Sequence, residues 1–149
     1  MHGACKGSDV AWLSVSATGP VVRLKRLWGA YGAAPKFHWL RAPEIGASMV
    51  RGRLGGTGAP FNLGEMTLTR CALQLESGEV GHGYVQGRDK QKAEIAALVD
   101  ALMQGPEAAA VKAAVLEPLS AEMAEVKTAR AEKAAATKVD FFTMVRGED

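Results

Sequence analysis

The fold is decided by one stretch, which reads MTLTRCALQL (residues 66–75), ESGE (76–79), VGHGYVQ (80–86), GRD (87–89) and KQKAEIAALVDALM (90–103). Its first and third parts have the composition of half-buried strands. Ser77-Gly78 between them favours a tight turn, because glycine reaches positive φ without steric cost. The sequence therefore predicts a β-hairpin over residues 66–86.

The periodicity changes after Gly87, which ends the returning strand. Apolar side chains then recur at helical spacing and form one stripe: Ile95, Leu98, Val99, Leu102 and Met103. Asp89 is a suitable N-cap for this helix, and Gly105-Pro106 ends it. Arg88 and Lys90 therefore flank a predicted helix start, where backbone N–H groups lack helical partners.

Two helices are predicted before the sheet. Ser8-Asp9 can cap a short first helix that buries Trp12 and Leu13. Gly19-Pro20 begins a second helix, and Gly32 is its expected C-terminal stop. The apolar face of this second helix comprises Val21, Leu24, Trp28 and Tyr31.

Two further strands are expected between these helices and the hairpin. The first runs over residues 36–42 and ends at Pro43, because proline cannot donate to a central ladder. The second runs over residues 49–54 and places Arg51 and Arg53 on one face. Residues 55–60 (GGTGAP) form the loop that follows.

The C-terminal third is predicted to be a long helix followed by an apolar tail. Apolar side chains spaced three and four apart give a packing seam at Leu116, Leu119, Met123 and Val126. Pro118 suits the first helical position. The alanine-rich continuation has high helix propensity but little to bury. Residues 139–149, which begin VDFFTMV, are expected either to return to the core or to dock on another chain by adding a strand to a sheet edge, and docking is favoured.

Composition limits the classes of protein. A chain of 149 residues with 48% hydrophobic and 23% charged residues is typical of one soluble domain. The net charge of +2 is too small, and its basic residues too dispersed, to predict a nucleic-acid binder. No apolar run reaches membrane-spanning length, so we expect a cytoplasmic protein without membrane contact. Cys5 and Cys71 fit no metal spacing and are expected to be thiols.

Several blocks together resemble one known family, the PhnG subunits of the carbon–phosphorus lyase system for phosphonate degradation. The blocks are LRAPEIG (40–46), RGRLGGTG (51–58), FNLGEMTLTR (61–70), GRDK (87–90), the helix of residues 93–103, and VDFFTMVRG (139–147). They follow one another in the family's order, from the second predicted helix to the C-terminus.

The resemblance implies a subunit of a core complex with PhnH-, PhnI- and PhnJ-like proteins. With PhnH, PhnI and the ATP-binding-cassette-like PhnL, such subunits support displacement of adenine from ATP by an alkylphosphonate. The product is a ribose 1-alkylphosphonate 5-triphosphate. The resemblance supplies no catalytic residue, because the nucleosidase chemistry is attributed mainly to PhnI and the later radical cleavage to PhnJ. No cofactor is expected on this subunit, and ATP is expected as a substrate of the complex.

The motifs of common active sites are missing from the sequence. Gly55-Gly56-Thr57-Gly58 is followed by Ala59-Pro60 rather than by lysine, so a tight connection is favoured over a phosphate loop. The three histidines lie apart from acidic or cysteine partners, which predicts no metal site. His82 stands between Gly81 and Gly83, a pattern that indicates a closely approaching backbone.

The candidate anion- or partner-binding residues lie in the blocks that carry the resemblance: Arg51, Arg53, Arg70, Arg88 and Lys90. Arginine could hold a triphosphate or phosphonate bidentately, but pairing across a subunit interface is favoured for a member of a complex. The candidate partner-binding residues of the tail are Phe141, Phe142, Met144, Val145 and Arg146.

The sequence thus predicts an α+β fold, with an antiparallel β-sheet, N-terminal helices, a central helix and a long C-terminal helix, in a single domain of residues 1–149. Three functions remain open from the residues. The first is a subunit of the triphosphate synthase, which the resemblance favours. The others are an independent phosphate- or nucleotide-binding module and a stand-alone enzyme.

Overall fold

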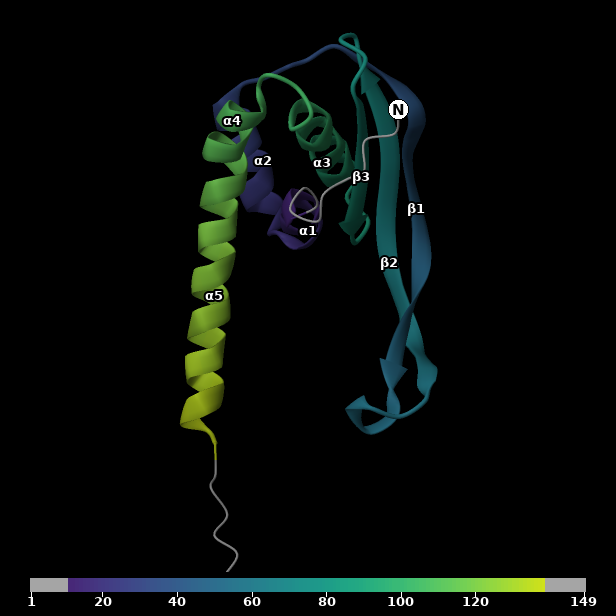
Figure 1. Ribbon diagram of the computed structural model, residues 1–149, viewed down its shortest axis with the longest axis vertical. Coiled ribbons are helices and arrows are strands. Elements are labelled where there is room, and N and C mark those ends of the chain that lie inside the picture. The colour runs from purple at the N-terminus through teal and green to yellow at the C-terminus, as the bar shows by residue number, and fades with distance from the viewer. Residues whose placement is uncertain (1–10, 139–149) are drawn as a thin grey trace, which may run out of the picture.

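The computed structural model describes residues 11–138 and shows a three-stranded antiparallel sheet with helices on one side (Figure 1). The strand order is β1-β2-β3. In chain order the elements are α1 (Ala11–Thr18), α2 (Val21–Tyr31), β1 (Phe37–Arg53), β2 (Pro60–Leu75), β3 (Val80–Gln86), α3 (Lys90–Leu102), α4 (Ala108–Val111) and α5 (Glu117–Ala136). The predicted α+β class is confirmed.

The hairpin and the central helix occur where the sequence places them. Gly78 takes a positive φ of 105° in the turn between β2 and β3. Gly87 (φ 96°) ends β3, and Asp89 caps α3 by accepting a hydrogen bond from the Lys92 backbone N–H at 2.9 Å. Gly32 ends α2 in the left-handed conformation, with its N–H bonded to the Trp28 carbonyl oxygen.

The prediction of two separate strands at 36–42 and 49–54 is wrong, because β1 runs without a break through Pro43. Proline is tolerated here for two reasons: β1 is an edge strand, and the pairing with β2 skips Leu40, Ala42 and Pro43. The missing N–H therefore costs no ladder hydrogen bond. β2 likewise begins at Pro60, well before the predicted Met66, and pairs with β1 along its whole length.

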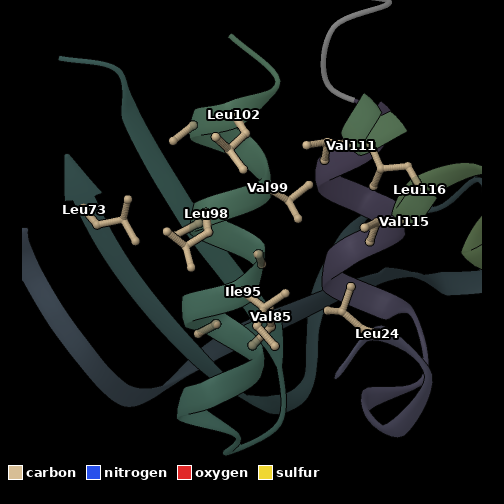
Figure 2. Close-up of a cluster of buried hydrophobic side chains, with 14 of the residues drawn as sticks. Leu24, Leu73, Val85, Ile95, Leu98, Val99, Leu102, Val111, Val115 and Leu116 are labelled. Atoms are coloured by element: carbon tan, nitrogen blue, oxygen red, sulfur yellow. The ribbon is translucent and has the colours of Figure 1, made fainter. Parts of the chain in front are cut away.

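The core lies on both sides of α3, which is sandwiched between the sheet and the other helices (Figure 2). Leu73 and Val85 approach α3 from the sheet, and Leu24, Val111 and Val115 approach from the helical side. All five are fully buried. Helix α3 is buried over most of its surface, which explains its many alanines.

Glycine on β3 permits a very close contact between the sheet and α3. A Cβ atom at Gly81 would lie 1.9 Å from the Ala97 carbonyl oxygen, and one at Gly83 would lie 2.1 Å from that of Ala93. No side chain fits in such a gap. The expected close approach of backbone on both sides of His82 is therefore confirmed.

The C-terminal helical path begins at Ala108, ten residues before the Pro118 at which the sequence predicted it. A π-helical turn, Lys112–Leu116, joins α4 to α5, and the Glu117 N–H bonds to the Lys112 carbonyl oxygen. Pro118 has no N–H, and the wider turn before it avoids the clash that proline causes in a regular helix. Of the predicted seam, Leu116 and Leu119 are buried but Val126 is 56% exposed.

Candidate functional site

Two parts of the molecule extend beyond the packed body in the same direction, one on each side of it (Figure 1). The first is the distal part of the β1–β2 hairpin. β3 ends at Gln86, opposite Leu68 and hence Gly46, so beyond that rung the sheet has only two strands. We call residues 47–67 the hairpin arm. An isolated two-stranded ribbon is marginally stable at best in water.

The hairpin arm exposes large apolar side chains. They are Met49 (49% exposed), Leu54 (73%), Phe61 (43%) and Leu63 (66%). Met49 alternates along β1 with Ala47 and Ile45, and Ile45 pairs with the buried Thr69. Met49 therefore continues the face of the sheet that α3 covers in the body, whereas Phe61 and Leu63 lie on the opposite face, beside Gly52.

The second extension is the distal part of α5, residues 124–136, which we call the helix arm. Every residue in it is exposed, whereas Leu119 is fully buried and Met123 is half-buried. The ion pair between Arg23 and Glu122 (2.5 Å) ties α5 to α2 just before the arm begins. Small and polar residues line a shallow open depression along it: Ala124, Lys127, Thr128, Ala131, Glu132 and Ala135. One helix supplies every wall, so the depression cannot enclose a small molecule.

The predicted basic candidates do not converge on one point. Arg51 and Arg53 lie near the tip of the hairpin arm, five and seven residues beyond the last three-stranded rung at Gly46. At about 3.3 Å per residue they stand roughly 17 and 23 Å from that rung. Arg88 and Lys90 lie beside the rung, since Gly87 donates its N–H to the Thr67 carbonyl oxygen. A single anion pocket made of all these residues is therefore not formed.

Arg70 is engaged within the chain. Its Nε donates to Glu44 Oε1 at 2.6 Å, and the same oxygen accepts from Arg41 Nη1 at 3.2 Å. Arg70 pairs in the sheet with the exposed Tyr84, on the face that α3 does not cover. Because one carboxylate is shared by two arginines, the cluster of Arg41, Glu44 and Arg70 keeps a net positive charge.

The N-terminus of α3 is occupied by its own carboxylate. Asp89 accepts from the Lys92 N–H and, through Oδ2, from Lys25 Nζ at 2.8 Å. The Lys25 hydrogen bond, followed by the backbone one, lowers the pKa of Asp89 below its ordinary value. An incoming phosphate would have to displace this cap. Arg88 and Lys90 remain exposed on either side of it.

Two buried polar residues were not foreseen from the sequence. Lys92 is 3% exposed and donates from Nζ to the Ala17 carbonyl oxygen at the end of α1, and its burial lowers its pKa. Asp100 is 6% exposed and accepts from Trp12 Nε1 and the His82 N–H. Both have partners that lie far away in sequence, so they tie α1 to α3 and β3. No local pattern could have shown this.

The glycine-rich loop is a tight connection. Gly55 and Gly56 take positive φ values, the Gly58 N–H bonds to the Leu54 carbonyl oxygen, and Arg53 Nη1 donates to the Gly58 carbonyl oxygen. The Gly58 N–H is thus already bonded within the loop. Over residues 11–138 no group of His, Cys, Asp or Glu side chains is placed to hold a metal ion, and no helix is long and apolar enough to cross a membrane.

The comparisons with known proteins decide the family. Residues 10–147 match the family described as "Phosphonate metabolism protein PhnG". The chain belongs to the PhnG family. It is also 43% identical, over the full length of both chains, to the alpha-D-ribose 1-methylphosphonate 5-triphosphate synthase subunit PhnG of Rhizobium meliloti (strain 1021).

The family predicted from the sequence blocks is thus confirmed, and with it a place in phosphonate metabolism. Most of the blocks that carry the resemblance map to β1, β2 and the start of α3, which include the hairpin arm and its root. The tail candidates Phe141, Phe142, Met144, Val145 and Arg146 lie outside the described residues, and their role stays a prediction.

Proposed function

We propose that this chain is a non-catalytic subunit of a ribose 1-alkylphosphonate 5-triphosphate synthase, the assembly in which an alkylphosphonate displaces adenine from ATP. The observation that supports this most is the full-length similarity to a synthase subunit PhnG. The fold is consistent with such a role, because the hairpin arm exposes four large apolar side chains close together in the chain, Met49, Leu54, Phe61 and Leu63.

The partners we propose are PhnI-, PhnH- and PhnJ-like subunits, with a PhnL-like protein bound transiently and ATP as a substrate of the complex. The described residues favour a supporting role over catalysis. The buried acid Asp100 is held between Trp12 and the His82 N–H, and the buried Lys92 is bonded to a helix carbonyl. Both side chains are therefore engaged in hydrogen bonds within the chain.

The basic candidates are proposed to pair with acidic groups of a neighbouring subunit. Arg51 and Arg53 are exposed on a two-stranded ribbon, where a bound triphosphate would stay in contact with water on most sides. Charged pairs become strong only where partner and protein exclude that water. Arg70, Arg88 and Lys90 stand at the root of the same arm and would meet the rim of such an interface.

The test is reconstitution from co-expressed subunits. With PhnI-, PhnH- and PhnJ-like chains present, this chain should co-elute with them, and addition of PhnL, ATP and methylphosphonate should release adenine. Omitting this chain should abolish the release, and the chain alone should release none. A chain that elutes alone beside its would-be partners contradicts the proposal, as does adenine release by the purified chain.

We further propose that residues 139–149 are a second docking element. Removal of Val139 onward should weaken association with the complex at least tenfold, and a thermal melt of the truncated chain checks that it is still folded. The double variant Phe141→Ser/Phe142→Ser should reproduce most of the loss. If both variants associated as strongly as the unaltered chain, the tail would not be part of the interface.

A further inference from the structure

We infer that the free edge of β1, over residues 45–50, accepts an extended segment of another synthase subunit as an additional strand of the sheet. We call these residues the open edge. The inference rests on the proposed function, since it specifies how the chain is held in its complex. The open edge lies on the outside of the sheet, and no helix or strand that the structure describes runs along it (Figure 1).

The open edge presents backbone groups that lack partners among the described residues. The Thr67 carbonyl oxygen accepts from the Gly87 N–H, on the β3 side of β2. Backbone groups alternate in direction along a strand, so those of Ala47, which is opposite Thr67, point away from β2. The pairing has no register shift over the open edge, so the groups of Ile45 and Met49 point the same way. Three N–H and three C=O groups therefore line this edge, ready to pair with a strand.

The other edges of the sheet are protected against such pairing. On β3, the Val80 carbonyl oxygen accepts from Gln104 Nε2 at 2.8 Å, and the His82 N–H donates to Asp100 Oδ2 at 2.8 Å. On the hairpin arm β2 is also an edge strand, but it carries the charge of Glu65 and a nearby shift in register. Charges and bulges are usual means by which edge strands avoid pairing with another chain. The open edge reads IGASMV and has neither charge nor proline.

The side chains of the open edge define the segment that fits beside it. Ile45 and Met49 are 47% and 49% exposed on the side of the sheet that carries the helices. On the opposite side stand Gly46 and Ser48, which are small. An added strand should therefore carry apolar side chains four residues apart toward the helices, with room for larger ones on the other side. Its ladder hydrogen bonds would supply affinity, and its alternate side chains specificity.

Charge and length favour another subunit over a second copy of this chain. β1 carries three arginines (Arg41, Arg51 and Arg53) and one glutamate (Glu44), a formal charge of +2. Two copies paired edge to edge would bring these like charges together, whereas a neutral or acidic segment meets no such repulsion. An edge of six residues is also well below the roughly 20–30 residues a side of a stable interface. It suits a segment of a subunit that is bound elsewhere as well.

Residue-resolved hydrogen exchange tests whether strand pairing occurs. In the isolated chain, the N–H groups of Ile45, Ala47 and Met49 should exchange faster than those of Gly46 and Ser48, which point toward β2. In the complex with PhnI-, PhnH- and PhnJ-like subunits, the three outward amides should slow by about tenfold or more. Unchanged exchange of these three amides in the complex overturns the inference.

A proline variant removes one outward donor and leaves the β1–β2 ladder intact. Ala47→Pro deletes an N–H that β2 does not use, so a thermal melt should show a folded chain. It should weaken association with the complex by about tenfold or more. The matched control Ala34→Pro makes the same change in the exposed linker before β1 and should bind as the unaltered chain does. A folded Ala47→Pro that binds equally well overturns the inference; if it does not fold, the exchange of the unaltered chain decides.

Photo-crosslinking in the assembled complex identifies the occupant. A photoreactive amino acid at Ile45 should capture a segment of another synthase subunit, and one at Glu76, exposed at the far end of the sheet, should not capture that segment. Capture of a second copy, of residues 1–10 or 139–149 of this chain, or of nothing overturns the inference. If the unaltered chain binds no synthase subunit, the proposed function fails as well. If it binds and these results differ from those expected, only the strand addition fails.

Discussion

The body and the arms of this chain are built from the same strands and helices but differ in how closely these pack. In the body, β2 and β3 press so closely on α3 that only glycine fits at positions 81 and 83. In the arms, the same strand β2 and the helix α5 continue into surface where Leu63 is 66% exposed and all of residues 124–136 are exposed. The contrast separates a body whose side chains pack within the chain from arms whose large apolar side chains no described residue covers.

The largest difference in stability between body and arm is expected for a pair of glycine-to-alanine variants. Gly83→Ala places a Cβ 2.1 Å from the Ala93 carbonyl oxygen and 2.7 Å from Cys71 Sγ, so β3 and α3 must separate. We expect a loss of about 3 kcal/mol or more in the free energy of unfolding, measured by urea denaturation. Gly46→Ala, at the root of the hairpin arm with no atom within 4 Å of the new Cβ, should change it by less than about 0.5 kcal/mol. Similar losses at both sites would refute the distinction.

Leucine truncations should give the next largest contrast. Leu119→Ala removes a fully buried side chain that anchors α5, and should cost about 2–5 kcal/mol of stability. Leu63→Ala on the hairpin arm should cost less than about 0.5 kcal/mol in the isolated chain, but it should weaken association with the complex. A large stability loss for Leu63→Ala would mean that the arm packs on the body after all.

The Asp89 cap should contribute a smaller and pH-dependent amount. Asp89→Ala removes both the cap and the partner of Lys25, and should cost about 1–2 kcal/mol near neutral pH. The folded pKa of Asp89 is lowered, so its contribution is present above the unfolded value of 3.8 and is lost as pH falls through the folded pKa. Asp89→Asn keeps a capping oxygen and should lose less. Thermal melts of the three proteins from pH 7 to pH 2 measure this contribution to stability. If the melting temperature fell equally with pH in all three, the Asp89 carboxylate would have no such role.

The smallest effect is expected at the Cys71 thiol. Burial raises the pKa of Cys71 to about 11, so its neutral form persists in the folded state up to that pH. In a Cys5→Ser background the folded chain should not react with a thiol reagent at pH 8 and should react fully in urea. Stability should decline as pH rises from about 9 to about 11. Rapid labelling of the folded chain at pH 8 would show that the sheet opens onto α3 more readily than the packing implies.

The sequence predicted correctly the turns and helix ends that depend only on neighbouring residues. Ser77-Gly78, Gly87-Arg88-Asp89 and Gly32 mark turns and caps whose backbone needs are met within a few residues, and the structure bears them out. Pro43 misled the prediction because its cost depends on where the strand sits in the sheet. On an edge strand, beside a shift in register, a missing backbone N–H removes no hydrogen bond from the sheet.

The candidate site was harder to predict than the fold. Arg51, Arg53 and Arg88 are exposed, as is usual for arginine. Only the strand register shows that Arg51 and Arg53 lie far from Arg88. The exposure of Val126 could not be predicted either, because it continues the same three-four spacing as the buried Leu119. The spacing of apolar residues predicts which face of a helix could be buried. It does not predict how far along that helix the neighbouring helices extend.

Hydrogen–deuterium exchange tests most directly the claim that the arms are completed by a partner subunit. In the isolated chain, amides of residues 47–67 and 124–136 should exchange much faster than those of β3 and α3. In the assembled complex both arms should become protected together, by at least tenfold, with little change in α3. Arms protected as well as α3 in the isolated chain, or arms still unprotected in the complex, would contradict the account.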